Sequence, residues 1–432
     1  MVTIKPFKST ILNPELPDRD RLVCPVYDTI DETEYARYGV ESNNVIHITT
    51  RNKSIGSEEF IAGSTGNLKR FFRDGVLVER EKPGFYIYGI RYSLPEDILG
   101  QIPAAAKRDV YFAFGLVALV RVEGLGEGSI VGHERIFETH TVERYDVMKA
   151  SGMNFAPIVA EYSMPGHDMN NMLEEYLGFR RPDLVIREDR PPLVDVSLKG
   201  IRHLLWEITD REMVGKIQAM MADRDLLILD GHHRYNAANE LRLRDGVEYT
   251  MMMFMEGGDR ALLLLPWHRC IRRLDREMLD SQIEQYFDVV WKGAPGDAFY
   301  GMLGARDDAL DVRIGMYDGR DFTVLKAHGD EVERLSGCLD EKVGLDYISL
   351  NEWVIEPLAN GDNVDNVGFV DSVAEAVRKV DEQGFMVAFL MRPLAIGDVE
   401  YKAYTEMKNF PQKSTLFLPK VAEGILMRRF RE

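Results

Sequence analysis

The residues best suited to chemistry lie in one short segment, 226–240, which reads LLILDGHHRYNAANE. Its apolar run ends abruptly at Asp230 and Gly231, and apolar or aromatic residues then recur at spacings of three from Tyr235. This pattern predicts a strand, a tight turn and a helix in direct succession. The turn brings together a carboxylate, a permissive glycine, two imidazoles and a guanidinium.

This turn has the composition of a phosphate site. His232, His233 and Arg234 are expected on the first helical turn, where free backbone N–H groups and the helix dipole favour an anion. Gly231 allows the backbone to approach a ligand closely, and Arg234 can offer a planar fork to a phosphate. The alternative is an ordinary strand–helix turn whose polar side chains are solvated.

The G-x-x-R turn between a strand and a Y-x-A-A helix resembles the nucleotide-phosphate turn of the ParB/sulfiredoxin superfamily. Gly231 and Arg234 match the glycine and the arginine of that turn. Asp230 matches the form that the free-serine kinases of the superfamily carry. His232 stands where sulfiredoxins have their reactive cysteine, so the resemblance does not imply sulfinate repair.

Over nearly its full length, the chain is similar to the uncharacterised domain-of-unknown-function family 1015. The similarity rests on motifs spread along the chain: IKPFKSTILNP, CPVYDTI, GLVALVRVE followed by HER, DGHHRYNAA, LLPWHR and FPQKSTLFLPK. In this family a His-Glu pair follows the loop 124–132, and His133 and Glu134 occupy that place. We therefore count Glu134 among the candidate site residues.

The length of the chain and its pattern of apolar and polar residues together predict an α/β (α+β) protein in two parts. Strands are expected at 85–92, 111–122, 193–198, 204–208, 226–229, 248–256 and 262–265. Helices are expected at 142–151, at 168–179, and through 221 from an N-cap at Thr209 or Asp210. Residues 1–274 are interpreted as a ParB/sulfiredoxin-like core with a mixed sheet and insertions, and residues 275–432 as a C-terminal α/β domain.

The amino-acid composition limits the classes of partner that this protein is expected to bind. The 432 residues are 45% hydrophobic and 29% charged, which is typical of a globular protein. A net charge of −18 disfavours general nucleic-acid binding. No stretch of about 18 or more apolar residues occurs, so a membrane span is not expected. Three scattered cysteines and the absence of a signal-peptide pattern indicate a reduced, cytoplasmic protein. The oligomeric state is not predicted.

Further candidate residues lie outside the turn. Asp28 is either a turn or capping residue or, by the resemblance to the kinases, the base, for which Glu32 is the neighbouring candidate. His268 and Arg269 follow a strand, where a cation pair can serve phosphate or end the strand. Three polar residues follow Pro411 in a loop without the glycine spacing of a Walker A motif: Lys413, Ser414 and Thr415. Four histidines are interpreted as structural: His47, His140, His203 and His328.

The leading hypothesis is a small-molecule kinase or related phosphotransferase that uses ATP or ADP with Mg²⁺. His232 or His233 would donate to phosphate oxygens, and Asp230 would hold Mg²⁺ or orient the acceptor hydroxyl. Glu134 or Asp28 would take the hydroxyl proton. The superfamily resemblance makes a free amino acid such as serine the first acceptor to test.

Two other classes remain open. One is a nucleotide-binding switch protein without turnover. The other is a metal-dependent hydrolase whose ligands would be Asp230 and four histidines: His133, His232, His233 and His268. Adjacent histidines on a helix point about 100° apart, and no H-x-x-x-H or H-E-x-x-H motif occurs, so a shared zinc is disfavoured.

The kinase hypothesis makes a geometric prediction. Glu134 and Asp28 should converge on the cleft of the DGHHR turn, because phosphoryl transfer needs a carboxylate opposite the phosphates. LLPWHR should return a strand beside the turn and bring His268 or Arg269 to the rim.

Overall fold

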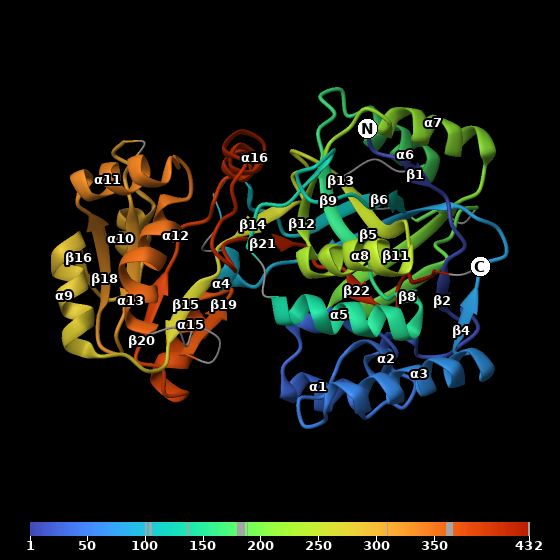
Figure 1. Cartoon of the computed structure of the whole chain (residues 1–432), viewed down its shortest axis with the longest axis horizontal. Helices are drawn as coiled ribbons and strands as arrows, with labels where there is room; N and C mark the ends of the chain where they lie inside the picture. Colours follow the sequence, from blue (N-terminus) through green and yellow to red (C-terminus); the bar gives the residue numbers. More distant parts are fainter. Residues whose placement is uncertain are drawn as a thin grey trace.

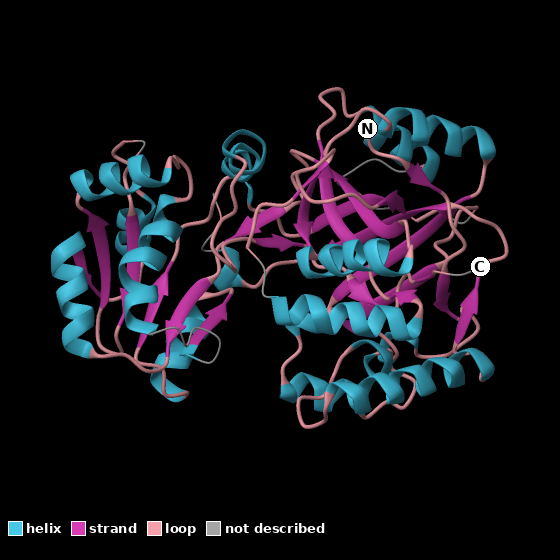
Figure 2. Cartoon of the chain, in the orientation of Figure 1, coloured by secondary structure: helices cyan, strands magenta, loops and turns pink. Residues whose placement is uncertain are grey.

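In the computed structural model the chain forms two lobes, each built around its own β-sheet (Figure 1). The structure describes residues 1–99, 102, 106–135, 138–178, 186–187, 189–308, 310–359 and 366–430. Both ends of the chain lie on the larger lobe. Helices flank the strands in both lobes, which confirms the mixed α/β class (Figure 2).

The sheet of the larger lobe is mixed. Its strands are β1 (Ile4–Lys5), β5 (Phe85–Tyr92), β6 (Tyr111–Arg121), β7 (Ile130–Val131), β9 (Ile158–Tyr162), β10 (Val194–Leu198), β11 (Ile201–Ile208), β12 (Leu226–Asp230) and β13 (Tyr249–Glu256). Their order is β10-β11-β5-β6-β13-β9-β12-β7, with β1 on β6. β12 pairs antiparallel to β9 and parallel to β7. The expected strands of this region are confirmed, whereas β1, β7 and β9 were not expected.

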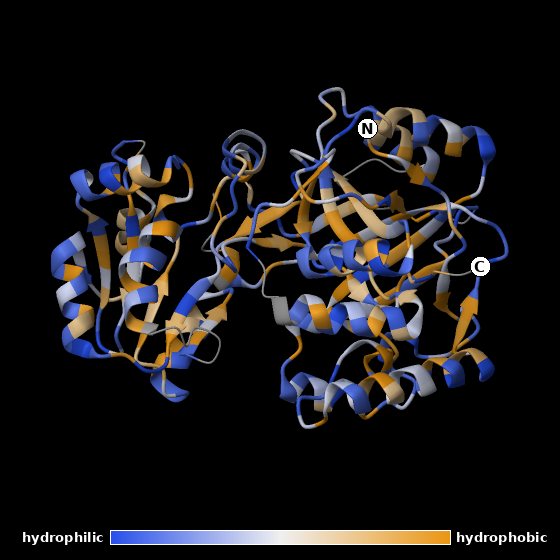
Figure 3. Ribbon diagram, in the orientation of Figure 1, coloured by the Kyte–Doolittle hydropathy of each residue, from blue (hydrophilic) through white to orange (hydrophobic). Residues whose placement is uncertain are grey.

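The larger lobe buries its sheet on both faces. Along β6, Phe112 and Phe114 pack into one core, while Ala113 and Val117 pack into another. Successive side chains of a strand point to opposite faces, so a strand covered on both sides reads as a continuous apolar run. This explains the sequence YFAFGLVALV in β6. Figure 3 shows apolar residues concentrated on the strands and polar residues on the outer helices.

The helices of this lobe include the three that were expected, although the helix expected at 142–151 begins earlier, at Glu138. They are α1 (Glu32–Gly39), α2 (Ile46–Thr49), α3 (Ser57–Arg73), α4 (Glu96–Leu99), α5 (Glu138–Ser151), α6 (Asp168–Leu177), α7 (Arg211–Met221) and α8 (His232–Asp245). Asp210 is the N-cap of α7, because its side chain accepts the backbone N–H of Met213 at 2.9 Å. α6 ends at Leu177, and residue 179 of the expected helix lies outside the described residues. None of the described helices combines the length and the apolar character needed to cross a bilayer.

The smaller lobe has an antiparallel sheet of order β16-β18-β17-β20-β15-β19. Its strands are β15 (His268–Ile271), β16 (Phe287–Gly293), β17 (Arg313–Tyr317), β18 (Phe322–Ala327), β19 (Val367–Val370) and β20 (Val387–Leu390). Its helices are α9 (Arg276–Tyr286), α10 (Asp297–Gly304), α11 (Gly329–Leu339), α12 (Leu345–Leu350), α13 (Glu356–Ala359) and α15 (Val373–Glu382).

The end of the chain returns to the larger lobe. After α16 (Ile396–Glu400), β21 (Leu416–Leu418) pairs with β14 (Leu263–Leu265). Next, β22 (Ala422–Glu423) pairs with β3 (Cys24–Pro25), and β23 (Arg428–Arg429) pairs with β8 (Met153–Asn154). The last short pair joins β2 (Thr10–Leu12) to β4 (Leu77–Glu79).

These strand pairings do not support the expected boundary between two domains at residue 274. β15 precedes that position yet belongs to the small sheet, and β21 to β23 follow it yet pair with strands of the larger lobe. We therefore propose that the small lobe interrupts one large domain, formed by residues 1–265 and 410–430. The expectation that LLPWHR returns a strand beside β12 is wrong, because β14 pairs with β21 and β15 lies in the other sheet.

Candidate functional site

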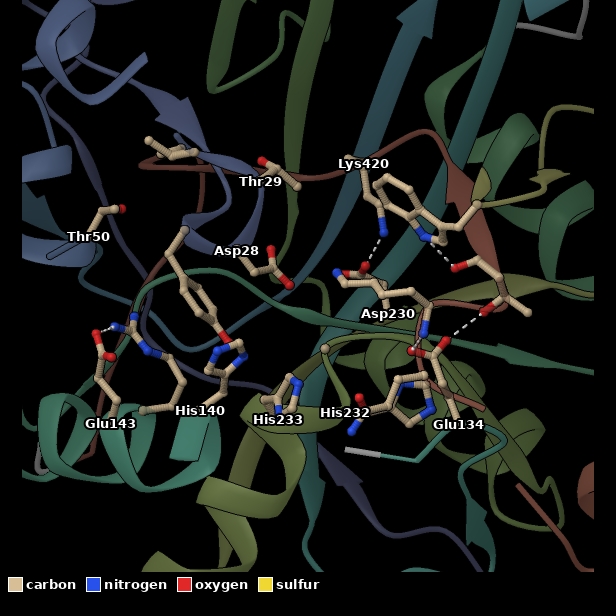
Figure 4. Close-up of a pocket in the computed structure, with 18 of the residues that line it drawn as sticks. Asp28, Thr29, Thr50, Glu134, His140, Glu143, Asp230, His232, His233 and Lys420 are labelled. Carbon is tan, nitrogen blue, oxygen red and sulfur yellow. Dashed lines mark hydrogen bonds and ion pairs between the residues drawn. The ribbon is translucent and has the colours of Figure 1, made fainter. Parts of the chain in front are cut away.

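A pocket of about 310 Å³ opens over the turn between β12 and α8. Asp230 ends the strand, Gly231 precedes the helix, and His232 and His233 form its first residues. All four line the pocket (Figure 4). The predicted strand, turn and helix are thus confirmed, and the N-terminus of a fourteen-residue helix opens into the pocket.

Gly231 is required by its backbone conformation. It has φ 92° and ψ 31°, a left-handed conformation that costs a residue with a Cβ about 1–2 kcal/mol. A Cβ there would also lie 2.8 Å from Nη2 of Arg234, whose guanidinium folds back over the turn.

Gly231→Ala should therefore lower the free energy of unfolding by at least about 1–2 kcal/mol, measured by urea denaturation. Gly215→Ala is the matched control: Gly215 lies inside α7 with open space around its Cα, so alanine should stabilise the protein by about 0.5–1 kcal/mol. If both variants stabilise the protein equally, the turn does not need its glycine.

Asp230 has both carboxylate oxygens bound to cations. Oδ2 lies 2.6 Å from Nη2 of Arg234, and Oδ1 is paired with the ammonium of Lys420. Burial alone would favour the neutral acid, but Lys420 and Arg234 lower the pKa of Asp230 below its ordinary value. Asp230 thus already has two cationic partners, and its expected roles as a Mg²⁺ ligand or in orienting the acceptor stay predictions.

Arg234 does not face the pocket. Its side chain is buried, and Nη1 donates to the carbonyl oxygen of Pro157 at 2.5 Å while Nη2 pairs with Asp230. Nη1 and Nη2 of the planar fork that was expected to hold a phosphate thus have partners within the protein, whereas Nε has no hydrogen-bond partner among the described residues. Arg234 positions Asp230 and fixes the turn.

His232 and His233 are neutral at pH 7. Burial lowers the pKa of His232 well below its ordinary value and that of His233 to about 4. The backbone N–H of His133 donates to Nε2 of His232 at 3.4 Å, so the neutral ring carries its proton on Nδ1. These side chains offer N–H donors to a ligand rather than positive charge.

The predicted convergence of Glu134 and Asp28 on this pocket is confirmed, because both residues line it (Figure 4). Asp28 is exposed and lies in a short 3-10 helix, Tyr27–Thr29. Glu134 is half-buried. Its Oε1 accepts the backbone N–H of Lys413 at 2.7 Å, and Oε2 lies 3.1 Å from Oγ1 of Thr415. Burial raises the pKa of Glu134.

His268 and Arg269 are not brought to the pocket. His268 is buried, and its Nδ1 accepts the backbone N–H of Met391 at 3.1 Å. Arg269 is buried as well and donates from Nη1 to the carbonyl oxygen of Trp267 at 2.8 Å. The neighbouring Trp267 lines the pocket instead. The expected ligand-binding role of His268 and Arg269 therefore has no geometric support.

Several lining residues were not among the candidates named from the sequence, although Lys413 and Thr415 were. Among the described residues, six basic and four acidic side chains line the pocket. The basic ones are Arg51, Lys53, Arg135, Arg144, Lys413 and Lys420. His140, interpreted from the sequence as structural, also lines it, with its ring centroid 5.1 Å from that of His233. The motif FPQKSTLFLPK was the available signal, since it supplies Lys413, Thr415 and Lys420.

Metal chemistry of the hydrolase type has no assembled ligand set in the part of the chain that the structure describes. No group of three or more His, Cys, Asp or Glu side chains there could hold a metal ion. His133 and His232 lie ring to ring at 4.7 Å, but His268 lies in β15 of the small sheet.

Residues 4–346 match the family described as "Protein of unknown function (DUF1015)", and the chain belongs to this family. No curated protein matches it. Among solved structures, a free serine kinase variant in complex with AMP is similar, with 11% identity, a TM-score of 0.36 and coverage of 67% of this chain and 84% of that chain. C-terminally truncated SbnI from Staphylococcus aureus has 12% identity, a TM-score of 0.37 and coverage of 71% and 85%. Likenesses of this size identify neither a site nor a ligand, and the superfamily link stays a prediction.

Proposed function

We propose that the pocket binds a nucleotide through its phosphates and that the protein transfers a phosphoryl group to a small hydroxyl-bearing metabolite. One observation carries the proposal. The N-terminus of α8 opens into a pocket with mostly basic charged side chains, although the whole chain has a net charge of −18. Helix N-termini and cations stabilise phosphate oxygens. Phosphoryl transfer asks mainly for positioning and charge neutralisation.

The rest of the pocket suits the other parts of such a reaction. Trp267 is held by a hydrogen bond from Nε1 to the carbonyl oxygen of Thr415 at 3.0 Å, and it offers an aromatic surface for a nucleobase. Asp28 places an exposed carboxylate in the same pocket, and we assign it the role of accepting the hydroxyl proton. Glu134 is less suited to that role because Lys413 and Thr415 already contact both of its oxygens. Serine is the first acceptor to test.

A thermal-shift series tests the donor. AMP, ADP, ATP and inorganic phosphate are each added with and without Mg²⁺, because a ligand that binds only the native state raises the apparent stability, by about 2.7 kcal/mol at one hundred times its Kd. We expect ADP or ATP to raise the Tm more than inorganic phosphate does. Phosphorus NMR with ATP and serine then detects transfer. If no nucleotide shifts the Tm, the proposal fails.

One observation favours a nucleotide switch as the second candidate. The chain enters the small lobe next to Trp267 and returns through Lys413 and Thr415, and all three line the pocket. A bound nucleotide would contact both connections and could bias the placement of the small lobe. Nucleotide binding without phosphorylation of any hydroxyl acceptor, together with altered proteolysis of the small lobe, would favour this function over transfer.

A further inference from the structure

Three polar side chains form a hydrogen-bonded chain at the edge of the pocket. His133 Nδ1 lies 2.8 Å from the carbonyl oxygen of Ile228, and His133 Nε2 lies 2.8 Å from Oγ1 of Thr415. The same Oγ1 lies 3.1 Å from Oε2 of Glu134. The chain thus runs from a buried strand to a carboxyl group that lines the pocket.

These contacts need one proton more than neutral His133, Thr415 and ionised Glu134 supply. The carbonyl oxygen of Ile228 only accepts, so Nδ1 of His133 must carry a proton. Nε2 of the neutral ring then has none, and Thr415 must donate its single proton to it. Thr415 has no second proton for Glu134. The last contact is a hydrogen bond only if the chain holds an additional proton.

We propose that His133, Thr415 and Glu134 hold this additional proton, that it resides on Glu134 in the ligand-free protein, and that its loss weakens binding of an anionic ligand. Glu134 then donates from Oε2 to Thr415, and Thr415 donates to His133, so every contact is satisfied. Burial supports this placement, because it raises the pKa of Glu134 and lowers the pKa of His133 to about 4.

Charged groups near His133 and Glu134 change the pKa values at both ends of this series of hydrogen-bonded side chains. Lys413, Lys420 and Arg269 face Glu134 and favour its ionised form. At the other end, Lys420 disfavours the charged form of His133, whose ring centroid lies 4.7 Å from that of neutral His232. The cations and the backbone N–H of Lys413 thus favour ionised Glu134, while burial of the carboxyl group retains the proton on it.

Release of this proton to solvent breaks only the O–H bond of Glu134, and it leaves a new negative charge in the pocket that contains Asp230. Phosphate oxygens would then meet an additional like charge. The ligand part of this inference rests on the proposed function, whereas the protonation of Glu134 is independent of any ligand.

Infrared spectroscopy of the ligand-free full chain at neutral pH tests the protonation directly. The difference spectrum between wild type and Glu134→Gln isolates the carboxylic-acid carbonyl band of Glu134, which we expect in the wild type. Thr415→Ser keeps the hydroxyl and should retain the pH midpoint of this band, while Thr415→Val should shift it. Absence of the band in wild type, or an unchanged midpoint in Thr415→Val, overturns the proposal. Circular dichroism checks that each variant is folded.

Calorimetric binding of ADP across pH tests the consequence. The wild-type affinity should fall by about fivefold as pH rises through the titration of Glu134. Glu134→Gln should show no such step, because its amide can donate to Thr415 and accept from Lys413 as the protonated acid does. An equal step in both proteins overturns the role of the proton in binding. If the infrared band is present but ADP does not bind, the proposed function is refuted, whereas the protonation of Glu134 is still supported.

Discussion

Asp230→Asn is expected to lower the free energy of unfolding by about 3–5 kcal/mol, because it leaves two cations in a largely buried site without a counter-charge. Asn keeps the shape of the side chain but removes the charge that pairs with Arg234 at 2.6 Å and with Lys420. The side chains of Asp230 and Arg234 are only 11% and 8% exposed, so solvent screens the pair weakly. Urea denaturation followed by circular dichroism measures the change.

Glu212→Gln is the control for this variant, because it removes a carboxylate from an exposed pair with Lys216. Solvent screens such pairs, and the control should unfold at the wild-type urea concentration. If Asp230→Asn also unfolds at the wild-type urea concentration, Asp230 is not the counter-charge of Arg234 and Lys420.

The same pair predicts a pH dependence. Lys420 and Arg234 hold the pKa of Asp230 in the folded protein below its value in the unfolded chain. The resulting stability is fully present above about pH 4, the ordinary range of an aspartate, and it is lost as pH falls toward the folded value. The difference in stability between wild type and Asp230→Asn should therefore shrink on acidification. A difference that stays constant from pH 7 to pH 3 would contradict this assignment.

Local patterns predicted the site backbone well. The apolar run before Asp230 and the helical spacing after it were enough to predict the strand, the turn and the helix, because both periodicities are properties of neighbouring residues. The same holds for β5, whose bounds were predicted as observed. Asp28 and Glu134 were placed in the pocket by the needs of the proposed chemistry, and the structure brings them there.

The side-chain pairings were harder to predict. Asp230 and Arg234 are four residues apart, a spacing at which a helical turn brings opposite charges together, yet the arginine was assigned to a phosphate. Lys420 follows Asp230 by 190 positions, and no local pattern indicates which lysine returns to the turn. His268 was predicted near a strand, but periodicity does not tell which sheet that strand joins.

Lys420→Met is expected to weaken ADP binding by at least about tenfold, which corresponds to about 1.4 kcal/mol. Lys420 lines the pocket and pairs with Asp230, so its removal has two effects of the same sign. The phosphates lose a cation, and the carboxylate of Asp230 keeps only Arg234 as a partner and repels them more strongly. Isothermal titration calorimetry at low and high salt measures the loss.

Lys149→Met is the matched control for Lys420→Met. It changes the net charge by the same amount, but Lys149 lies on α5 outside this pocket and pairs with Asp245. Its ADP affinity should remain that of the wild type. The difference between the two variants should be larger at low salt, because ions screen the attraction between a lysine and a phosphate. Equal ADP affinities in Lys420→Met and Lys149→Met would mean that Lys420 serves only to hold Asp230, and that the helix N-terminus and the other lining cations bind the phosphates without it.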